Sequence, residues 1–167
     1  MLRFLDEFSG TSDAADWRVF SDRVMGGVST GSAVVTMVQG CRALRLTGTV
    51  SLERNGGFLQ MARAIDHRVL PHGDASAFAG LFLTVCGSPG TYFIHLRTAD
   101  TRAPWMYYAA PLPVTSVWSD VVIPWSAFVP KALQRALDPS RLTRLGVVAA
   151  GTAFDADIAV ARVALAP

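Results

Sequence analysis

The residues from Ser21 to Ser29 combine the polar and flexible residue types from which a binding loop is built. The segment reads Ser-Asp-Arg-Val-Met-Gly-Gly-Val-Ser. Adjacent glycines let the backbone adopt positive φ and bring amide groups close to a partner. We therefore interpret the loop as a candidate ligand-binding surface made of Asp22, Arg23, Met25, Gly26, Gly27 and Ser29. The alternative is structural: the glycines form a turn or bulge, and Asp22 and Ser29 hydrogen-bond to the local backbone.

A second glycine pair, Gly56 and Gly57, lies between Asn55 and an apolar run that begins at Phe58. Asn-Gly before an apolar run is typical of a hairpin turn. The functional alternative is that this turn packs beside the first glycine loop, which adds Asn55 and Gly57 to the candidate surface. The first loop has neither the GxGxxG nor the GxxxxGK[ST] spacing of a phosphate-binding loop.

Polar side chains on predicted strands form a second candidate surface. His95 and Arg97 share one face of a strand, and Arg63 ends the strand that begins at Phe58. A sandwich core does not hold such side chains without partners, so we expect them to face solvent or a polar concavity. The ring of Tyr107 suits a sugar-like or peptide ligand and is expected to line the same region.

The sequence offers little for catalysis or metal binding. It has no GxSxG or HExxH motif, and its carboxylates are too scattered to indicate a glycosidase pair. His67 and His72 lie five residues apart in a predicted loop, which is weak support for a metal site. Cys41 and Cys86 form no CxxC unit and are interpreted as buried, reduced thiols. We expect no catalytic residues, no metal and no cofactor.

Composition and charge narrow the class of protein. The 167 residues are 51% apolar and 17% charged, which suits one domain over residues 1–167 and excludes a disordered chain. The net charge is only +2, and the sequence contains no block of like charges, so no nucleic-acid partner is expected. Turn residues interrupt the longest charge-free stretch, 75–94, so we expect no membrane span. Acidic residues precede any apolar run of signal-peptide length, so we expect a cytoplasmic protein.

Short apolar runs bounded by Gly, Pro, Asn, Asp or Ser predict strands along most of the chain. In residues 92–98, the apolar Tyr92, Ile94 and Leu96 alternate with more polar positions, and residues 42–50 and 156–165 are also predicted strands. The best helix candidate is Pro130–Leu137, which ends before Asp-Pro. Strand signals every 8–12 residues, about the spacing of all-β domains, favour an all-β sandwich or barrel.

Four segments together resemble one known family. They are the Asp22–Ser29 loop, Asn55–Phe58, Tyr92–Arg97 and the WxxVxIPW pattern of Trp118–Trp125. In order and spacing they are similar to the CIA30 family, named for complex I intermediate-associated protein 30. The resemblance implies a galactose-binding-like jelly-roll β-sandwich. It also implies a relation to assembly factors of respiratory NADH:ubiquinone oxidoreductase, and it provides no catalytic residues that can be carried over to this chain.

Three functional hypotheses follow. The leading one is a non-enzymatic binding module that holds a protein partner, such as a respiratory complex subunit, through the glycine-loop surface. The alternative is a carbohydrate-binding module that uses the concave sheet face. The third is an enzyme, which requires Asp22, Arg23 and His95 to converge in one cleft.

Overall fold

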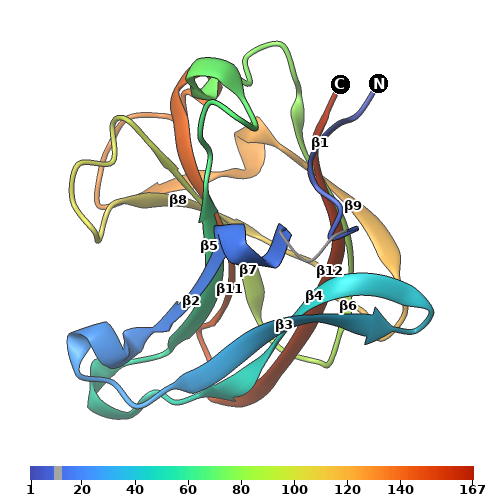
Figure 1. The fold of residues 1–167 in the computed structure, drawn as a ribbon. Helices are drawn as coiled ribbons and strands as arrows, with labels where there is room; N and C mark the ends of the chain where they lie inside the picture. Colours follow the sequence, from blue (N-terminus) through green and yellow to red (C-terminus); the bar gives the residue numbers. More distant parts are fainter. Residues whose placement is uncertain (10–12) are drawn as a thin grey trace.

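The strands form two facing antiparallel sheets, which we call sheet A and sheet B, in a computed structural model that describes residues 1–9 and 13–167 (Figure 1). Sheet A has the order β3 (Thr30–Val38), β4 (Cys41–Val50), β12 (Phe154–Ala166), β6 (Gly80–Gly87) and β9 (Ser119–Pro124), with β1 (Arg3–Asp6) beside β12. Sheet B has the order β10 (Val129–Lys131), β8 (Tyr107–Pro111), β7 (Tyr92–Thr98), β11 (Leu142–Ala150), β5 (Phe58–Ala64) and β2 (Trp17–Ser21). This architecture confirms the predicted all-β jelly-roll sandwich.

Helical structure in the described residues consists of short 3₁₀ turns within the loops. They are η1 (Asp13–Asp16), η2 (Asp22–Met25), η3 (Glu53–Asn55), η4 (Pro71–Gly73), η5 (Trp125–Ala127) and η6 (Pro139–Arg141). Among residues 1–9 and 13–167, no helix has the length and apolar character needed to cross a membrane.

The helix predicted over Pro130–Leu137 is wrong. The segment leaves β10 with Ala132 at φ 63°, which a right-handed helix does not contain. The buried Tyr108 then donates its phenolic hydrogen bond to the carbonyl oxygens of Arg135, at 2.8 Å, and Ala136, at 3.3 Å. These carbonyls are therefore held by a distant side chain rather than by a helical turn.

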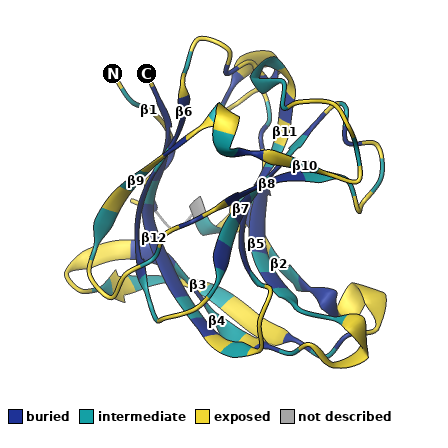
Figure 2. Cartoon of the chain, turned by 180° about the vertical axis from the view of Figure 1, so that it is seen from behind, coloured by how far each residue is buried: buried dark blue, intermediate teal, exposed yellow. Residues whose placement is uncertain are grey.

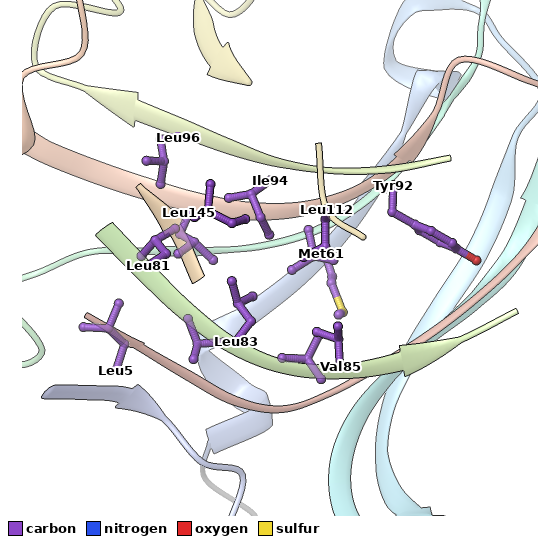
Figure 3. Packing of buried hydrophobic residues seen from close by; sticks show 14 of the residues in the cluster. Leu5, Met61, Leu81, Leu83, Val85, Tyr92, Ile94, Leu96, Leu112 and Leu145 are labelled. Atoms are coloured by element: carbon purple, nitrogen blue, oxygen red, sulfur yellow. The ribbon is translucent and has the colours of Figure 1, made fainter. Parts of the chain in front are cut away.

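The core lies between the two sheets. Leu83 and Val85 of β6 pack with Ile94 and Leu96 of β7 and with Leu145 of β11 (Figure 3). The inward alternation predicted from the sequence is confirmed, because all of the expected core positions in 42–50 and 92–98 are buried: Leu44, Leu46, Val50, Tyr92, Ile94 and Leu96. Burial of each such side chain contributes about 1.5–3 kcal/mol to the hydrophobic driving force.

A β-bulge in β11 controls which side chains reach the outer face of sheet B. The pairing of β11 with β7 shifts between Leu142 and Arg144, so that Leu142 and Leu145 are both buried. Arg144 consequently lies on the opposite face from these two leucines. This placement matters for the site described below.

Candidate functional site

Asp22 joins the two glycine loops from inside the protein. Its Oδ1 accepts a hydrogen bond from the amide of Ser29 at 2.9 Å. Its Oδ2 accepts from the Ser29 hydroxyl at 2.5 Å, from the Gly57 amide at 2.6 Å and from the Phe58 amide at 3.3 Å. The side chains of Asp22 and Ser29 are both buried. We call Asp22 and the three residues that donate to it, Ser29, Gly57 and Phe58, the Asp22 clamp.

The clamp explains why glycines occur in both loops. A Cβ atom added at Gly27 or at Gly56 would overlap the carboxylate of Asp22. Burial raises the pKa of Asp22, but the hydrogen bonds from Ser29, Gly57 and Phe58 outweigh it and leave the pKa below its ordinary value. The carboxylate is therefore ionised and fully engaged, so Asp22 and Ser29 act as structural residues, as in the structural alternative.

Eight exposed residues of the two glycine loops form a surface, which we call the loop tip, whereas Gly27 is buried against Asp22. The loop tip comprises Arg23, Val24, Met25 and Gly26 from one loop and Leu52, Glu53, Arg54 and Asn55 from the other. Figure 2 shows this region in yellow beyond the end of β2. Met25 is 67% exposed although it is a large apolar residue. The predicted proximity of the two glycine loops is thus present, with an apolar and cationic outer surface.

A recess of about 60 Å³ lies on the outer face of sheet B. It is lined by Phe20, Gln60, His95, Arg97, Pro104, Tyr107 and Arg144. The rings of His95 and Tyr107 stack with centroids 4.2 Å apart and an interplanar angle of 18°. Of the residues expected to share a polar face, His95, Arg97 and Tyr107 are brought together here.

The two arginines of the recess have different surroundings. Arg97 donates hydrogen bonds to the carbonyl oxygens of Thr101 and Ala103, at 3.1 and 2.9 Å, and so fixes the loop that carries Pro104. The guanidinium carbon of Arg144 lies 4.4 Å from the ring centroid of Phe20, in a cation–π contact. Burial, together with the charge of Arg97, lowers the pKa of Arg144 below its ordinary value.

The buried Asp22 clamp adjoins the recess. Phe20 lines the recess just before Asp22 in the chain, and the Phe58 amide bonds directly to the Asp22 carboxylate. The two phenyl rings meet edge to face with centroids 6.5 Å apart. The clamp therefore positions one wall of the recess as well as the loop tip.

Arg63 does not belong to this face, contrary to expectation. Its side chain is buried, and Nη1 lies 3.1 Å from the Asp6 carboxylate. The Asp6 carboxylate also accepts a hydrogen bond from Trp17 Nε1 at 2.8 Å. The core can hold Arg63 because Asp6 provides a buried counter-charge, a long-range pairing that strand alternation does not reveal.

The remaining sequence candidates lie elsewhere. His67 and His72 are exposed, and no group of three His, Cys, Asp or Glu side chains in residues 1–9 and 13–167 is arranged to hold a metal ion. Cys86 is buried, whereas Cys41 is exposed at the start of β4, so the expectation of a buried thiol is wrong there. The enzyme hypothesis requires Asp22 and His95 to converge. Within the described chain, no hydrogen bond joins these two residues, and the Asp22 carboxylate bonds to Ser29 instead.

Sequence reasoning missed four recess residues: Phe20, Gln60, Pro104 and Arg144. Strand alternation could have placed Gln60 and Arg144 on the outer face, because each is next to a buried position, Leu59 and Leu145. No local pattern indicates that these residues share a recess with His95, since they come from separate strands.

His95 gives a pH-dependent prediction. Burial, with a smaller contribution from the charge of Lys131, lowers the pKa of His95 from 6.5 to about 4. Between these two values the unfolded chain binds a proton that the folded chain excludes, so stability falls as the pH drops through this window. We expect the wild type to lose about 3 kcal/mol more stability than His95→Gln between neutral pH and pH 4, measured by urea unfolding. Equal losses in the two proteins would contradict a half-buried His95 that stays neutral in the folded state.

Several solved structures are similar to this fold. The family 11 carbohydrate-binding module of the cellulosomal cellulase Lic26A-Cel5E of Clostridium thermocellum aligns over 99% of this chain and 94% of its own, with 15% identity and a TM-score of 0.78. The Clostridium thermocellum module in complex with a β-1,3-1,4-mixed-linked tetrasaccharide aligns over 99% of this chain and 95% of its own, with 14% identity and a TM-score of 0.76. A family 30 carbohydrate-binding module aligns over 83% of this chain and 75% of its own, with 17% identity and a TM-score of 0.56.

These likenesses concern the fold, because sequence identity is low. A comparison with curated protein sequences finds no significant match. The family model described as complex I intermediate-associated protein 30 matches residues 6–159, which include the Asp22 clamp, the loop tip and all the residues of the recess. The chain therefore belongs to the CIA30 family.

Proposed function

We propose that the chain is a non-enzymatic binding module that holds a protein partner, in keeping with the complex I assembly intermediate after which its family is named. One observation carries this proposal: the loop tip exposes Val24, Met25 and Leu52 on loops that are fixed by buried hydrogen bonds. Exposed apolar side chains on ordered loops are the usual material of protein–protein contacts. Because the loops are already ordered, binding costs little conformational entropy.

The loop tip also indicates the character of the partner surface. Arg23 and Arg54 are exposed beside the apolar side chains, with Glu53 as the acidic residue among them. A complementary surface is therefore apolar at its centre and acidic at its rim. Subunits and assembly intermediates of NADH:ubiquinone oxidoreductase are the candidate partners.

Substitution at Met25 tests the proposal. Met25→Glu places a charge in the centre of the loop tip, and we expect about 10-fold less capture of complex I subunits from detergent-treated membranes. Met37→Glu is the matched control, because Met37 is 62% exposed on β3, outside the two loops. Capture would be quantified by mass spectrometry against the wild-type protein. Equal capture by the two variants, or no complex I subunit with the wild type, would contradict the proposal.

A second candidate function is carbohydrate binding on the outer face of sheet B. Phe20, His95 and Tyr107 supply rings in the recess, and aromatic rings suit the apolar faces of sugars. The solved carbohydrate-binding modules with this fold add support by analogy. An array of neutral and acidic oligosaccharides tests it: binding that Tyr107→Ala abolishes would support it, and absence of binding would remove it.

A further inference from the structure

Arg144 is a half-buried cation that has no acidic neighbour among residues 1–9 and 13–167. Among the described residues, none accepts a hydrogen bond from its guanidinium, and its charge lies over the Phe20 ring. Six other arginines of the described chain lie within 4 Å of an aspartate carboxylate, as Arg45 does with Asp157 and Arg141 does with Asp100. A partly desolvated charge that has lost water without gaining a counter-charge is unfavourable, and an anionic ligand would compensate for it.

The rest of the recess has the same electrostatic character. Arg97 is the second cation in its lining, and Lys131 is close enough to influence the titration of His95. None of the described residues that line the recess is an acid. Gln60 adds an amide group that can donate a hydrogen bond. The recess therefore favours a group that is negatively charged and accepts hydrogen bonds.

The size of the recess restricts this group further. Its volume of about 60 Å³ is well below the roughly 300 Å³ of the smaller small-molecule sites. A planar guanidinium binds a carboxylate through two parallel hydrogen bonds, so one carboxylate matches both the volume and the donor. The recess lies next to the Asp22 clamp, which also presents the loop tip.

We infer that the recess on the outer face of sheet B receives the carboxylate of an acidic side chain from the protein partner. This inference rests on the proposed protein-binding function and specifies the partner chemistry at one point. The partner would then make two contacts: an apolar patch on the loop tip, and a glutamate or aspartate in the recess. Two separate contacts would fix both the position and the orientation of the partner.

Two short peptides test the inference on the isolated chain. Acetyl-Gly-Glu-Gly-amide and acetyl-Gly-Gln-Gly-amide differ in charge and little in shape, and their binding can be followed by NMR chemical shifts of isotope-labelled protein. We expect the glutamate peptide to bind about 10-fold more tightly, with the largest shifts at Gln60, His95 and Arg144. Raising the salt concentration should weaken this preference.

Arginine variants identify the cation. Arg144→Gln should remove the preference for the glutamate peptide, and Arg144→Lys, which keeps the charge without the planar fork, should retain part of it. Arg162→Gln is the matched control, because the Arg162 guanidinium lies 5.8 Å from the Phe82 ring on sheet A, and it should keep the full preference. If Arg144→Gln fails to fold, the lysine variant and the two-peptide comparison still provide the test.

Three outcomes would overturn the inference: equal binding of the two peptides, full preference in Arg144→Gln, or tighter Arg144-dependent binding of D-glucuronate than of the glutamate peptide. The last would identify a site for an acidic sugar instead. Failure of the peptide test with normal capture of complex I subunits would overturn this inference alone. A clear glutamate preference without such capture would support the recess site and count against the proposed partner.

Discussion

Replacing Asp22 by asparagine is expected to lower the free energy of unfolding by about 4 kcal/mol, measured by urea denaturation at neutral pH. The carboxylate accepts four hydrogen bonds, from two groups of Ser29 and from the amides of Gly57 and Phe58. An asparagine side chain has one oxygen, so its NH₂ group must face at least one buried N–H donor. The loss therefore includes charge-assisted hydrogen bonds and the cost of buried donors left without acceptors.

Two comparisons make this prediction specific. Glu53→Gln changes an exposed carboxylate on the neighbouring loop and should alter the stability by less than about 0.5 kcal/mol. Because the pKa of Asp22 is lowered in the folded protein, its contribution is present above the ordinary pKa of 3.8 and is lost as the pH falls through the native value. The difference between wild type and Asp22→Asn should therefore shrink on acidification. A loss below about 1 kcal/mol at neutral pH would show that the clamp is not a structural centre.

Replacing Arg63 by methionine is expected to cost about 4 kcal/mol in the same assay. The substitution keeps an apolar stem of similar length but removes the guanidinium that lies 3.1 Å from the buried Asp6 carboxylate. Removing one member of a buried ion pair leaves the other charge in a medium that solvates it poorly. The double variant Arg63→Met with Asp6→Asn should recover part of the loss, because the asparagine oxygen can still accept the hydrogen bond from Trp17.

Arg68 provides the control for this prediction. Its guanidinium lies 2.7 Å from Asp66 and 3.2 Å from Asp16, but the side chain is 63% exposed, against 6% for Arg63. Exposed ion pairs contribute little, so Arg68→Met should cost less than about 1 kcal/mol. Similar losses in Arg63→Met and Arg68→Met would contradict the difference that burial is expected to make.

The residues of the family motif have two roles, structural stability and partner binding, and the Asp22 clamp accounts for the first. Its buried members, Asp22 and Ser29, hold the two loops together, and the exposed residues of both loops form the loop tip. Substitutions at Asp22 should therefore change stability first and binding as a consequence. Substitutions at Met25 should change partner capture while leaving the fold intact, because its side chain is mainly exposed. Comparing the two classes of variant distinguishes the frame of the site from its surface.

The sequence alone was enough to predict the all-β class of the fold and, within the predicted strands, much of which side chains face the core and which face outward. Alternation along 92–98 placed Tyr92, Ile94 and Leu96 in the core and His95 and Arg97 on the opposite face, as the structure has them. This works because successive side chains of a strand point to opposite faces, a property of the backbone that needs no knowledge of neighbouring strands. The loop motifs likewise identified the family, since their order and spacing are linear features of the chain.

Tertiary structure alone decided which polar side chains share a surface. Arg63 lies in the core because Asp6, 57 residues away in sequence, reaches it there, and Asp22 is engaged because Gly57, 35 residues away, donates to it. The recess joins Phe20, Gln60, His95, Tyr107 and Arg144 from five strands of sheet B. Strand order and register arise from the packing of the whole sandwich, so the buried counter-charge and the grouping of arginines on one face have no local signature in the sequence.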